Sequence, residues 1–558
     1  MINLKKWLLI LVGSFTWSLT MVKSGLHYPF GLGFWGANGH DGVWHIALAE
    51  SLSRGMFENP VFSNFKIQNY HIGFDLALGF LAKITNLTVI NLYFQILPPI
   101  LAILIGVLTY KFVKEWTNSD GSAFWSVFFV YFGGSLGFLI GKGESAFWSQ
   151  QSISTLINPP FALSLILILL GLSALIKYEK LKSKRSLILS ILFFGVLSSI
   201  KIYAALLTLL GLFLICVYRY VKNKDKSFFV ILIGVFVLSL AFYLPLNKSS
   251  QSMVIWQPFW FLETMMGTSD RLGWDRFYSA MSTYKSGHVW LKFISAYSVA
   301  FAIFWIGNMG TRIINGFIVL KWSKNHDKFS WVNLFVVSVI LAGGMVPLLF
   351  LQKGTPWNTI QFFYYSLFFS GILAGVSLNE ILKLIKKPVS RNIILGIILF
   401  LTLPTTYLTL NQVYIPSRPP AKVSTEELSA LDFLSTQPQG VVLTFPFDSS
   451  ASKAAEAFPP RPLHLYVSTA YVSAFSRHQV YLEDEVNLDI TGYDWRVRRK
   501  QIEDWYKESD SLKARAFLKD NNIKYIYWVK GQRALLGEGQ LGLSNIYENN
   551  SSTVYRVD

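Results

Sequence analysis

Long apolar runs and short polar loops alternate along the first three quarters of the chain. The apolar runs have close to the roughly 20 residues that a helix needs to cross a membrane. They predict eleven spans, near residues 7–22, 88–112, 122–140, 158–177, 186–200, 202–218, 227–246, 289–320, 329–352, 357–382 and 392–411. The run at 289–320 is too long for a simple crossing, and it predicts a break near Gly307–Gly310.

The short apolar segment 71–84 interrupts this alternation. It follows Tyr70, begins with His71, and is too short for a full crossing. We interpret it as an interfacial or re-entrant helix inside a first outside loop that covers residues 25–87. If the segment were a full crossing, every later loop would change sides.

The charges of the loops test this topology, because cytoplasmic loops carry an excess of Lys and Arg. The N-terminus and the five loops predicted to be inside, 111–121, 177–185, 219–226, 321–328 and 383–391, hold 20 Lys and Arg. Four segments predicted to be outside, 25–70 (the first outside loop without its short apolar segment), 141–157, 247–288 and 353–356, total 109 residues and hold eight. The sequence therefore predicts a multi-pass protein of the cell membrane with a cytoplasmic N-terminus and an extracytoplasmic C-terminal region.

Residues 417–558 contain no run long enough to cross a membrane and predict a separate α/β domain. Helices are expected at 426–434 and 510–519, and strands at 440–445 and 524–529. Strands that alternate with helices indicate a small packed sheet. The predicted fold class is thus a polytopic α-helical membrane module, residues 1–416, followed by an extracytoplasmic α/β domain.

Composition narrows the function. The chain has 558 residues, 52% of them hydrophobic, and a net charge of +18. The tail from residue 417 holds 17 Lys and Arg against 18 Asp and Glu, so the excess of positive charge belongs to residues 1–416, where the basic residues lie in short loops between spans. This distribution is typical of membrane topology and excludes a nucleic-acid-binding surface as its cause. Cys216 is the single cysteine, which excludes an intrachain disulfide and a cysteine-based zinc site. The chain has no P-loop, dinucleotide fingerprint, His-Glu-x-x-His or Gly-x-Ser-x-Gly motif.

The first outside loop concentrates ionisable side chains beside apolar sequence. Asp41 and His45 are four residues apart, and a helix that opens at Asp41 and continues through Ser51 places both on one face. Tyr70 and His71 follow, with Asp75 one turn later. Ionisable groups at a membrane surface are functional candidates because their desolvation is costly. A structural role is the alternative, with Asp41 as a helix N-cap and Tyr70 and His71 marking the bilayer boundary.

Later outside turns carry basic and aromatic residues. Lys201 lies between two apolar runs, Arg271 lies in the loop 247–288, and Lys353 precedes a span. The same loop contains Trp256 and Glu263, in a composition that suits sugar stacking and phosphate binding. Snorkelling lysines and an interfacial aromatic belt are the structural alternatives. Within a span, Arg312 needs a partner or a water-filled cavity.

This layout resembles the GT-C superfamily of multi-spanning glycosyltransferases, which use polyprenyl-phosphate sugars at the outer face of the membrane. The resemblance rests on the acidic residue Asp41 soon after the first span, on the segment that begins Tyr70-His71, on basic residues of later outside turns and on the external α/β tail. Many members carry paired acids such as Asp-x-Asp in the first loop, whereas this chain has His40-Asp41.

The resemblance implies inverting transfer of a sugar from a polyprenyl-phosphate donor to a glycan, lipid or protein acceptor of the cell envelope. It implies Asp41 as the catalytic base and Lys201, Arg271 and Lys353 as donor-phosphate ligands. Acceptor or sugar contacts would come from His45, Tyr70, His71, Trp256 and Glu263. A divalent cation, Mg²⁺ or Mn²⁺, held by Asp41, His45 and His71 is left open. A transporter or flippase of lipid-linked glycans and a non-catalytic scaffold are the rival functions.

Overall fold

The computed structural model describes residues 2–247, 254–324, 329–532 and 542–558. These residues form two compact units. The helical unit comprises the described parts of Met1–Thr20, Pro98–Pro245 and Ser250–Ile415, and the mixed unit comprises those of Met21–Leu97, Leu246–Ser249 and Pro416–Asp558. The first outside loop is thus grouped with the tail rather than with the spans, whereas the sequence-based division places its boundary at residue 416.

Backbone pairing explains why the first loop joins the tail. Strand β2 (Gly31–Phe34) of the loop pairs antiparallel with β5 (Ala421–Val423) of the tail. With β1 (His27–Tyr28) and β7 (Arg461–Pro462) they form a four-stranded sheet in the order β1-β2-β5-β7. Gly31 is required where β2 starts, because its φ is +109° and an added Cβ would lie 2.0 Å from the carbonyl oxygen of Val423.

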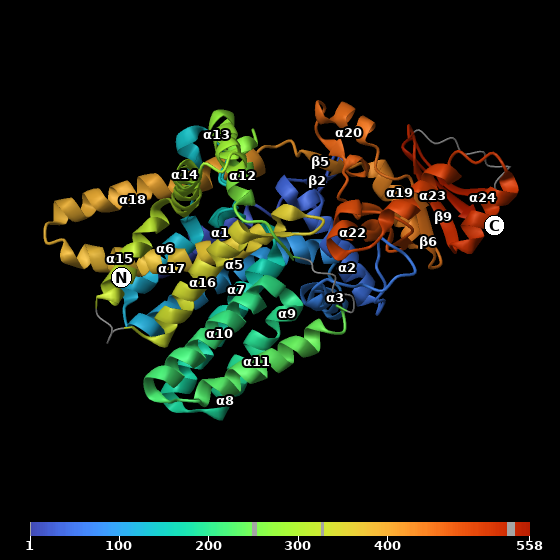
Figure 1. Cartoon of the computed structure of the whole chain (residues 1–558). Coiled ribbons are helices and arrows are strands. Elements are labelled where there is room, and N and C mark those ends of the chain that lie inside the picture. Colours follow the sequence, from blue (N-terminus) through green and yellow to red (C-terminus); the bar gives the residue numbers. More distant parts are fainter. Residues whose placement is uncertain (1, 248–253, 325–328, 533–541) are drawn as a thin grey trace. The chain divides into compact units, whose positions relative to one another are not determined.

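The helical unit consists almost entirely of apolar helices. Its members are α1 (Ile2–Ser18), α5 (Leu97–Thr117), α6 (Asp120–Phe132), α7 (Pro159–Leu181), α8 (Lys184–Gly195), α9 (Leu197–Ile200), α10 (Ile202–Asn223), α11 (Ser227–Tyr243), α12 (Trp260–Gly267), α13 (Asp275–Ser286), α14 (Trp290–Met309), α15 (Asn315–Ser323), α16 (Trp331–Leu349), α17 (Gln361–Leu384) and α18 (Pro388–Thr409). Helices α7, α8, α10 and α11 lie side by side in Figure 1. A short ribbon joins β3 (Val254–Trp256) to β4 (Phe350–Gln352).

Eight helical segments within the described residues are long and apolar enough to cross a membrane: 89–117, 120–140, 159–181, 202–223, 290–323, 331–349, 356–384 and 388–414. Each matches a predicted span. The other three predicted spans coincide with α1, with α8 and α9, and with α11, which are shorter. The membrane-protein class is confirmed, and the number eleven stays a prediction.

The predicted break in the long run at 289–320 is confirmed. Helix α14 ends at Met309, a 3-10 turn covers Gly310–Ile314, and α15 then begins. Gly310 has a φ of +52°, and a Cβ there would lie 2.2 Å from the carbonyl oxygen of Gly134. Only glycine fits both the left-handed backbone and this close approach.

The tail contains the expected packed sheet. Its five strands are β6 (Val441–Thr444), β8 (Gln479–Val480), β9 (Ile523–Val529), β10 (Leu543–Glu548) and β11 (Ser552–Val557), in the order β10-β11-β9-β6-β8. Strand β6 runs parallel to β8 and β9. Helices α19 (Thr425–Ser435) and α24 (Ser511–Asp520) fall where the sequence predicts them, and so do β6 and β9.

Shorter helices complete the mixed unit: α2 (Asp41–Ser53), α3 (Gly73–Thr85), α4 (Val89–Asn91), α20 (Ser449–Glu456), α21 (Tyr471–Ser476), α22 (Glu485–Thr491) and α23 (Trp495–Trp505). Helix α3 is the expected helix at 71–84, and its 13 residues are too few to span a membrane. It packs closely on α2, because a Cβ on Gly79 would lie 2.6 Å from the carbonyl oxygen of Ala49. Its interfacial or re-entrant placement stays a prediction.

Reporter domains inserted at Lys184, the first residue of α8, and fused after Asp558 are expected to lie on opposite sides of the membrane. The reason is the 20-to-8 distribution of Lys and Arg between the two sets of loops. Paired alkaline phosphatase and fluorescent protein reporters measure the side at each position. The same side at both positions would contradict the topology and the outside location of the first loop.

Candidate functional site

The candidate site in the mixed unit starts at the first turn of α2. Asp41 is the first residue of α2, and His40 before it is the N-cap residue. The His40 side chain makes no capping hydrogen bond. The structural prediction that Asp41 is the N-cap is therefore wrong. Asp41 instead lies 2.8 Å from Nδ1 of His40, and its side chain is half exposed. A carboxylate in the first turn is favoured by the helix dipole and remains accessible to another molecule.

One turn further along α2, His45 points inward. Its Nδ1 lies 2.7 Å from a carboxylate oxygen of Asp75, and the two side chains are 5% and 0% exposed. The rings of Tyr93 and Phe74 lie 5.7 and 5.8 Å from the imidazole. This buried pair links α2 to α3, so it holds the helix whose first turn carries Asp41.

Tyr70 and His71 adjoin this pair. The Tyr70 ring lies 6.5 Å from His45, 5.6 Å from Trp44 and 4.7 Å from His71, all measured between ring centroids. Burial, reinforced by the Asp75 carboxylate, raises the pKa of Tyr70 well above its ordinary value. Tyr70 is thus a neutral phenol at any physiological pH and can donate a hydrogen bond. The structure brings together His45, Tyr70 and His71, as the sequence predicts for the first loop.

The tail adds a carboxylate to this neighbourhood that the sequence analysis missed. Asp484 is buried at the start of α22 and accepts hydrogen bonds from the Asn487 backbone and side chain at 3.2 and 2.7 Å. Burial raises the pKa of Asp484 to about 6, with the nearby Asp41 carboxylate adding to the effect and His40 opposing it. The run Glu483-Asp484-Glu485 right after a strand was the available sequence signal.

His40 interacts with both of these carboxylates. Burial lowers the pKa of His40, but the charges of Asp41 and Asp484 and the hydrogen bond to Asp41 outweigh it and leave the pKa above its ordinary value. A positively charged His40 favours the ionised form of Asp41. His40 is therefore electrostatically coupled to both Asp41 and Asp484.

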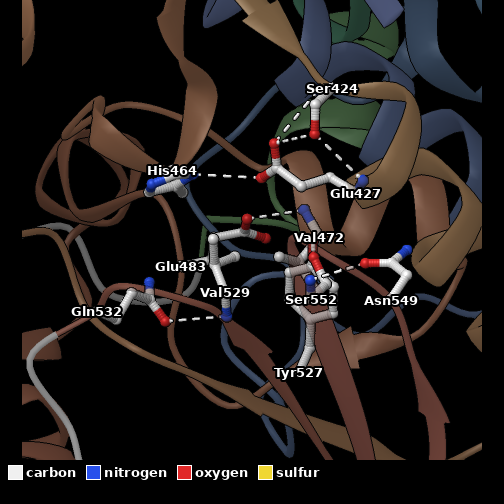
Figure 2. Close-up of polar contacts among 10 residues, drawn as sticks. All are labelled: Ser424, Glu427, His464, Val472, Glu483, Tyr527, Val529, Gln532, Asn549 and Ser552. Carbon is white, nitrogen blue, oxygen red and sulfur yellow. Dashed lines mark hydrogen bonds and ion pairs between the residues drawn. The ribbon is translucent and has the colours of Figure 1, made fainter.

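A second polar cluster lies in the tail, at the carboxyl ends of β6 and β8. Figure 2 shows Glu427 between Ser424 and His464, with Oε1 3.2 Å from the imidazole, and Glu483 accepting from the Val472 backbone N–H at 2.8 Å. The cavity beside Glu483, Asp484 and His464 has a volume of about 30 Å³. This is room for water molecules rather than for a sugar ring.

Burial raises the pKa of Glu483 to about 8. The folded protein then holds this proton more tightly than the unfolded chain, so the stability it contributes is lost as pH rises from about 4.5 to about 8. We expect Glu483→Gln to reduce the fall in melting temperature over this range. Differential scanning fluorimetry of the purified protein measures it, with Glu426→Gln, an exposed change in α19, as the control. Equal slopes in both variants would contradict the assignment.

The residues present do not fit a metal centre of the predicted composition. Across the part of the chain that the structure describes, no three His, Cys, Asp or Glu side chains converge on a site that could hold a metal ion. The set Asp41, His45 and His71 is therefore not assembled as a metal site.

The predicted phosphate-binding residues belong to the helical unit. Lys201 is 5% exposed, and its Nζ donates to Oδ1 of Asn158 at 3.4 Å and lies 5.7 Å from the Tyr203 ring. The Tyr203 hydroxyl donates to Oε1 of Gln352 at 3.2 Å, so the turn at Lys201 adjoins the segment that precedes Lys353. The structure thus brings two of the three predicted cationic turns together. Lys353 itself is exposed.

The third cation, Arg271, contacts a different segment. Its guanidinium lies 4.5 Å from the Trp148 ring, and Nη1 donates to the Ser145 hydroxyl at 3.2 Å. Glu263 is engaged by the Tyr297 hydroxyl and by Lys285, both at 2.6 Å. These contacts give Arg271 and Glu263 structural partners already.

Trp256 and Arg312 differ sharply in exposure. Trp256 ends β3 and remains 59% exposed, with its ring 5.1 Å from Phe350. Arg312 is fully buried, and its guanidinium is held by the side chain of Gln151 and by the carbonyl oxygens of Asn308 and Met309 at 2.7 and 3.1 Å. Amide oxygens thus provide partners for Nε and Nη2 of this buried arginine, whereas Nη1 has no hydrogen-bond partner among the described residues.

Comparison with known proteins yields structural likeness alone, since no family model and no curated protein sequence matches the chain. The apo oligosaccharyltransferase of Archaeoglobus fulgidus superposes with a TM-score of 0.53 and 12% identity, covering 94% of this chain and 69% of that one. The same enzyme tethered to an acceptor peptide with the NVT sequon superposes with a TM-score of 0.53 and 10% identity, again covering 94% of this chain and 69% of that one. The arabinofuranosyltransferase AftD from Mycobacteria superposes with a TM-score of 0.51 and 12% identity, covering 99% of this chain and 40% of that one. At these identities the likeness establishes a shared fold.

Proposed function

We propose, from the GT-C fold that the chain shares with these two membrane transferases, that it is an inverting glycosyltransferase that uses a polyprenyl-phosphate sugar at the extracytoplasmic face. The observation that carries the proposal is the arrangement around Asp41. The accessible carboxylate of Asp41 begins α2 and contacts His40. The buried His45–Asp75 pair links the same helix to α3. A lipid-linked donor also agrees with the missing nucleotide motifs.

In this reaction Asp41 takes the proton of an acceptor hydroxyl. The acceptor oxygen then attacks the anomeric carbon as the bond from that carbon to the phosphate oxygen breaks, and polyprenyl phosphate leaves with the bonding electrons. A positioned base contributes typically 10²- to 10⁴-fold to such a step. Lys201, Arg271 and Lys353 would offset the negative charge that grows on the leaving phosphate.

The remaining predicted contacts take different roles. The buried contact with Asp75 makes His45 a positioning residue for α2 rather than an acceptor ligand. Tyr70 and His71 lie nearer the surface of the same cluster and are proposed to contact the acceptor or the sugar. The exposed Trp256 suits stacking on a sugar or a prenyl chain, and Glu263 supports the loop through Tyr297. The acceptor is proposed to be a glycan, lipid or protein of the cell envelope.

The proposal is tested with purified protein, a panel of polyprenyl-phosphate sugars and acceptors, and a mass-spectrometric assay for the transferred sugar. The assay runs with Mg²⁺, with Mn²⁺ and with a chelator. Transfer that depends on a lipid-linked donor supports the proposal, and chelator-sensitive transfer would require cation ligands beyond those that the described residues assemble. Donor binding without transfer across the panel would contradict it in favour of a transporter or scaffold.

Lys201→Met is expected to weaken donor binding about tenfold or more as well as slowing turnover. The reason is that the donor phosphate is charged before and after the reaction, and a charge-assisted hydrogen bond contributes about 1.5–3 kcal/mol. Binding of a non-hydrolysable donor analogue by microscale thermophoresis measures it. Lys83→Met, which removes an exposed charge from α3, is the matched control. Unchanged donor affinity in Lys201→Met would assign the lysine a purely structural role.

A further inference from the structure

A cavity of about 670 Å³ lies at one end of the helical unit. It is lined by the last turns of α5, α7, α10, α15 and α17 and by the first turns of α6 and α16. All five loops predicted to be inside contribute to it, so the structure gathers at one end the segments that the charge pattern places on one side. Its volume is in the range of small-molecule sites.

The charges that line this cavity leave an excess of cations. Five basic side chains, Lys180, Arg219, Lys222, Lys321 and Lys383, face three acidic ones, Glu115, Glu179 and Glu380. Arg219 pairs with Glu179, and Lys321 and Lys383 pair with Glu380 at 2.8 and 2.7 Å.

Lys180 and Lys222 have other contacts. The Nζ of Lys180 donates to the Glu115 carbonyl oxygen at 3.5 Å, and that of Lys222 donates to the Tyr218 hydroxyl at 3.2 Å. Neither Nζ lies within 4.0 Å of a carboxylate of any described residue. Two lysines at one cavity therefore keep their charge available to an anion.

Aromatic and acidic side chains that line the same cavity further restrict the class of ligand that it fits. Trp116, Trp322 and Trp331 line the cavity, and Trp116 lies 6.0 Å from Trp322. Tryptophan is enriched where a bilayer meets water. A carboxylate oxygen of Glu115, Oε2, is buried without a hydrogen-bond partner among the residues that the structure describes. Such an oxygen requires a donor, which a hydroxyl or ammonium group would supply.

We propose that this cavity binds the headgroup of a glycerophospholipid from the membrane leaflet on its side, with the phosphate at Lys180 and Lys222 and a headgroup hydroxyl or ammonium near Glu115. The phosphate matches the two lysines, and the headgroup hydroxyl or ammonium matches the Glu115 carboxylate. The acyl chains match the indole rings. This site is independent of the sugar transfer proposed above, since no residue that lines it belongs to the candidate transfer site.

The test compares Lys180→Gln/Lys222→Gln with the matched control Lys177→Gln/Lys224→Gln. Each removes one exposed lysine near the end of α7 and one near the end of α10, and the control residues do not line the cavity. Native mass spectrometry of the full chain in detergent, titrated with phosphatidylglycerol and with phosphatidylethanolamine, measures the dissociation constants. Size-exclusion chromatography shows whether each variant is folded.

The cavity variant is expected to bind phospholipid about thirtyfold more weakly than the wild type, since each of the two lysines near an anionic headgroup contributes about fivefold. The control is expected to change less than threefold. Equal losses in both variants would overturn the proposal. So would displacement of the lipid by millimolar inorganic phosphate, because the ligand would then be free phosphate rather than a headgroup.

Discussion

Asp41→Asn is expected to reduce sugar transfer on the order of 10²-fold or more while leaving the fold and donor affinity unchanged. An amide cannot accept the proton of the acceptor hydroxyl, although it keeps the size of the side chain. The stability cost is expected to be small, about 1 kcal/mol or less, because Asp41 is half exposed and makes no N-cap. The measurement is single-turnover transfer by the purified variant beside its thermal melting curve.

Asp432→Asn is the matched control, since it removes an exposed aspartate from α19 of the same unit. It is expected to transfer sugar at the wild-type rate. If Asp41→Asn also retained nearly wild-type turnover, the carboxylate would return to a structural role, and a base would have to be sought elsewhere. Asp484 would then be the next candidate, because burial raises its pKa to about 6.

Asp75→Ala is expected to destabilise the mixed unit by about 3 kcal/mol and to abolish activity at temperatures where the wild type is active. Removing one partner of a buried hydrogen bond leaves the other without that partner, which costs about 1–3 kcal/mol, and more when the group left behind is charged. Here the partner left behind is His45, which is 5% exposed among aromatic rings. Thermal unfolding and limited proteolysis of the mixed unit measure the effect.

Asp75→Asn separates packing from charge, because the amide oxygen can still accept from His45. Its destabilisation is expected to be about half that of the alanine variant. If Asp75→Ala melted at the wild-type temperature, the buried pair would contribute nothing to the position of α2, and the account of how Asp41 is held would be wrong.

Local sequence patterns predicted the elements well. Long apolar runs predicted the helices that could span a membrane, because a helix must reach a minimum length to cross a bilayer. In the tail, α19 was predictable because Ser424 and Glu427 form a capping box at its start, with the Ser424 hydroxyl accepting from the Glu427 backbone N–H. Gly310 broke the long run at 289–320 for an equally local reason, its left-handed backbone.

The grouping of the first loop with the tail could not be predicted in the same way. It depends on pairing of Leu32 with Val423, residues far apart in the chain that carry no mutual signal in one sequence. The candidate site shows the same division. Asp41 and His45 were recognised by their spacing, whereas Asp484 comes from a distant segment and His45 proved to be a buried partner of Asp75.

The most direct test of the central claim follows both products in proteoliposomes loaded with one polyprenyl-phosphate sugar and an acceptor. The account predicts one free polyprenyl phosphate for each sugar that reaches the acceptor, without added nucleotide, and loss of both products in Asp41→Asn. Movement of the intact donor across the bilayer with no release of polyprenyl phosphate would contradict it, and would identify a flippase instead.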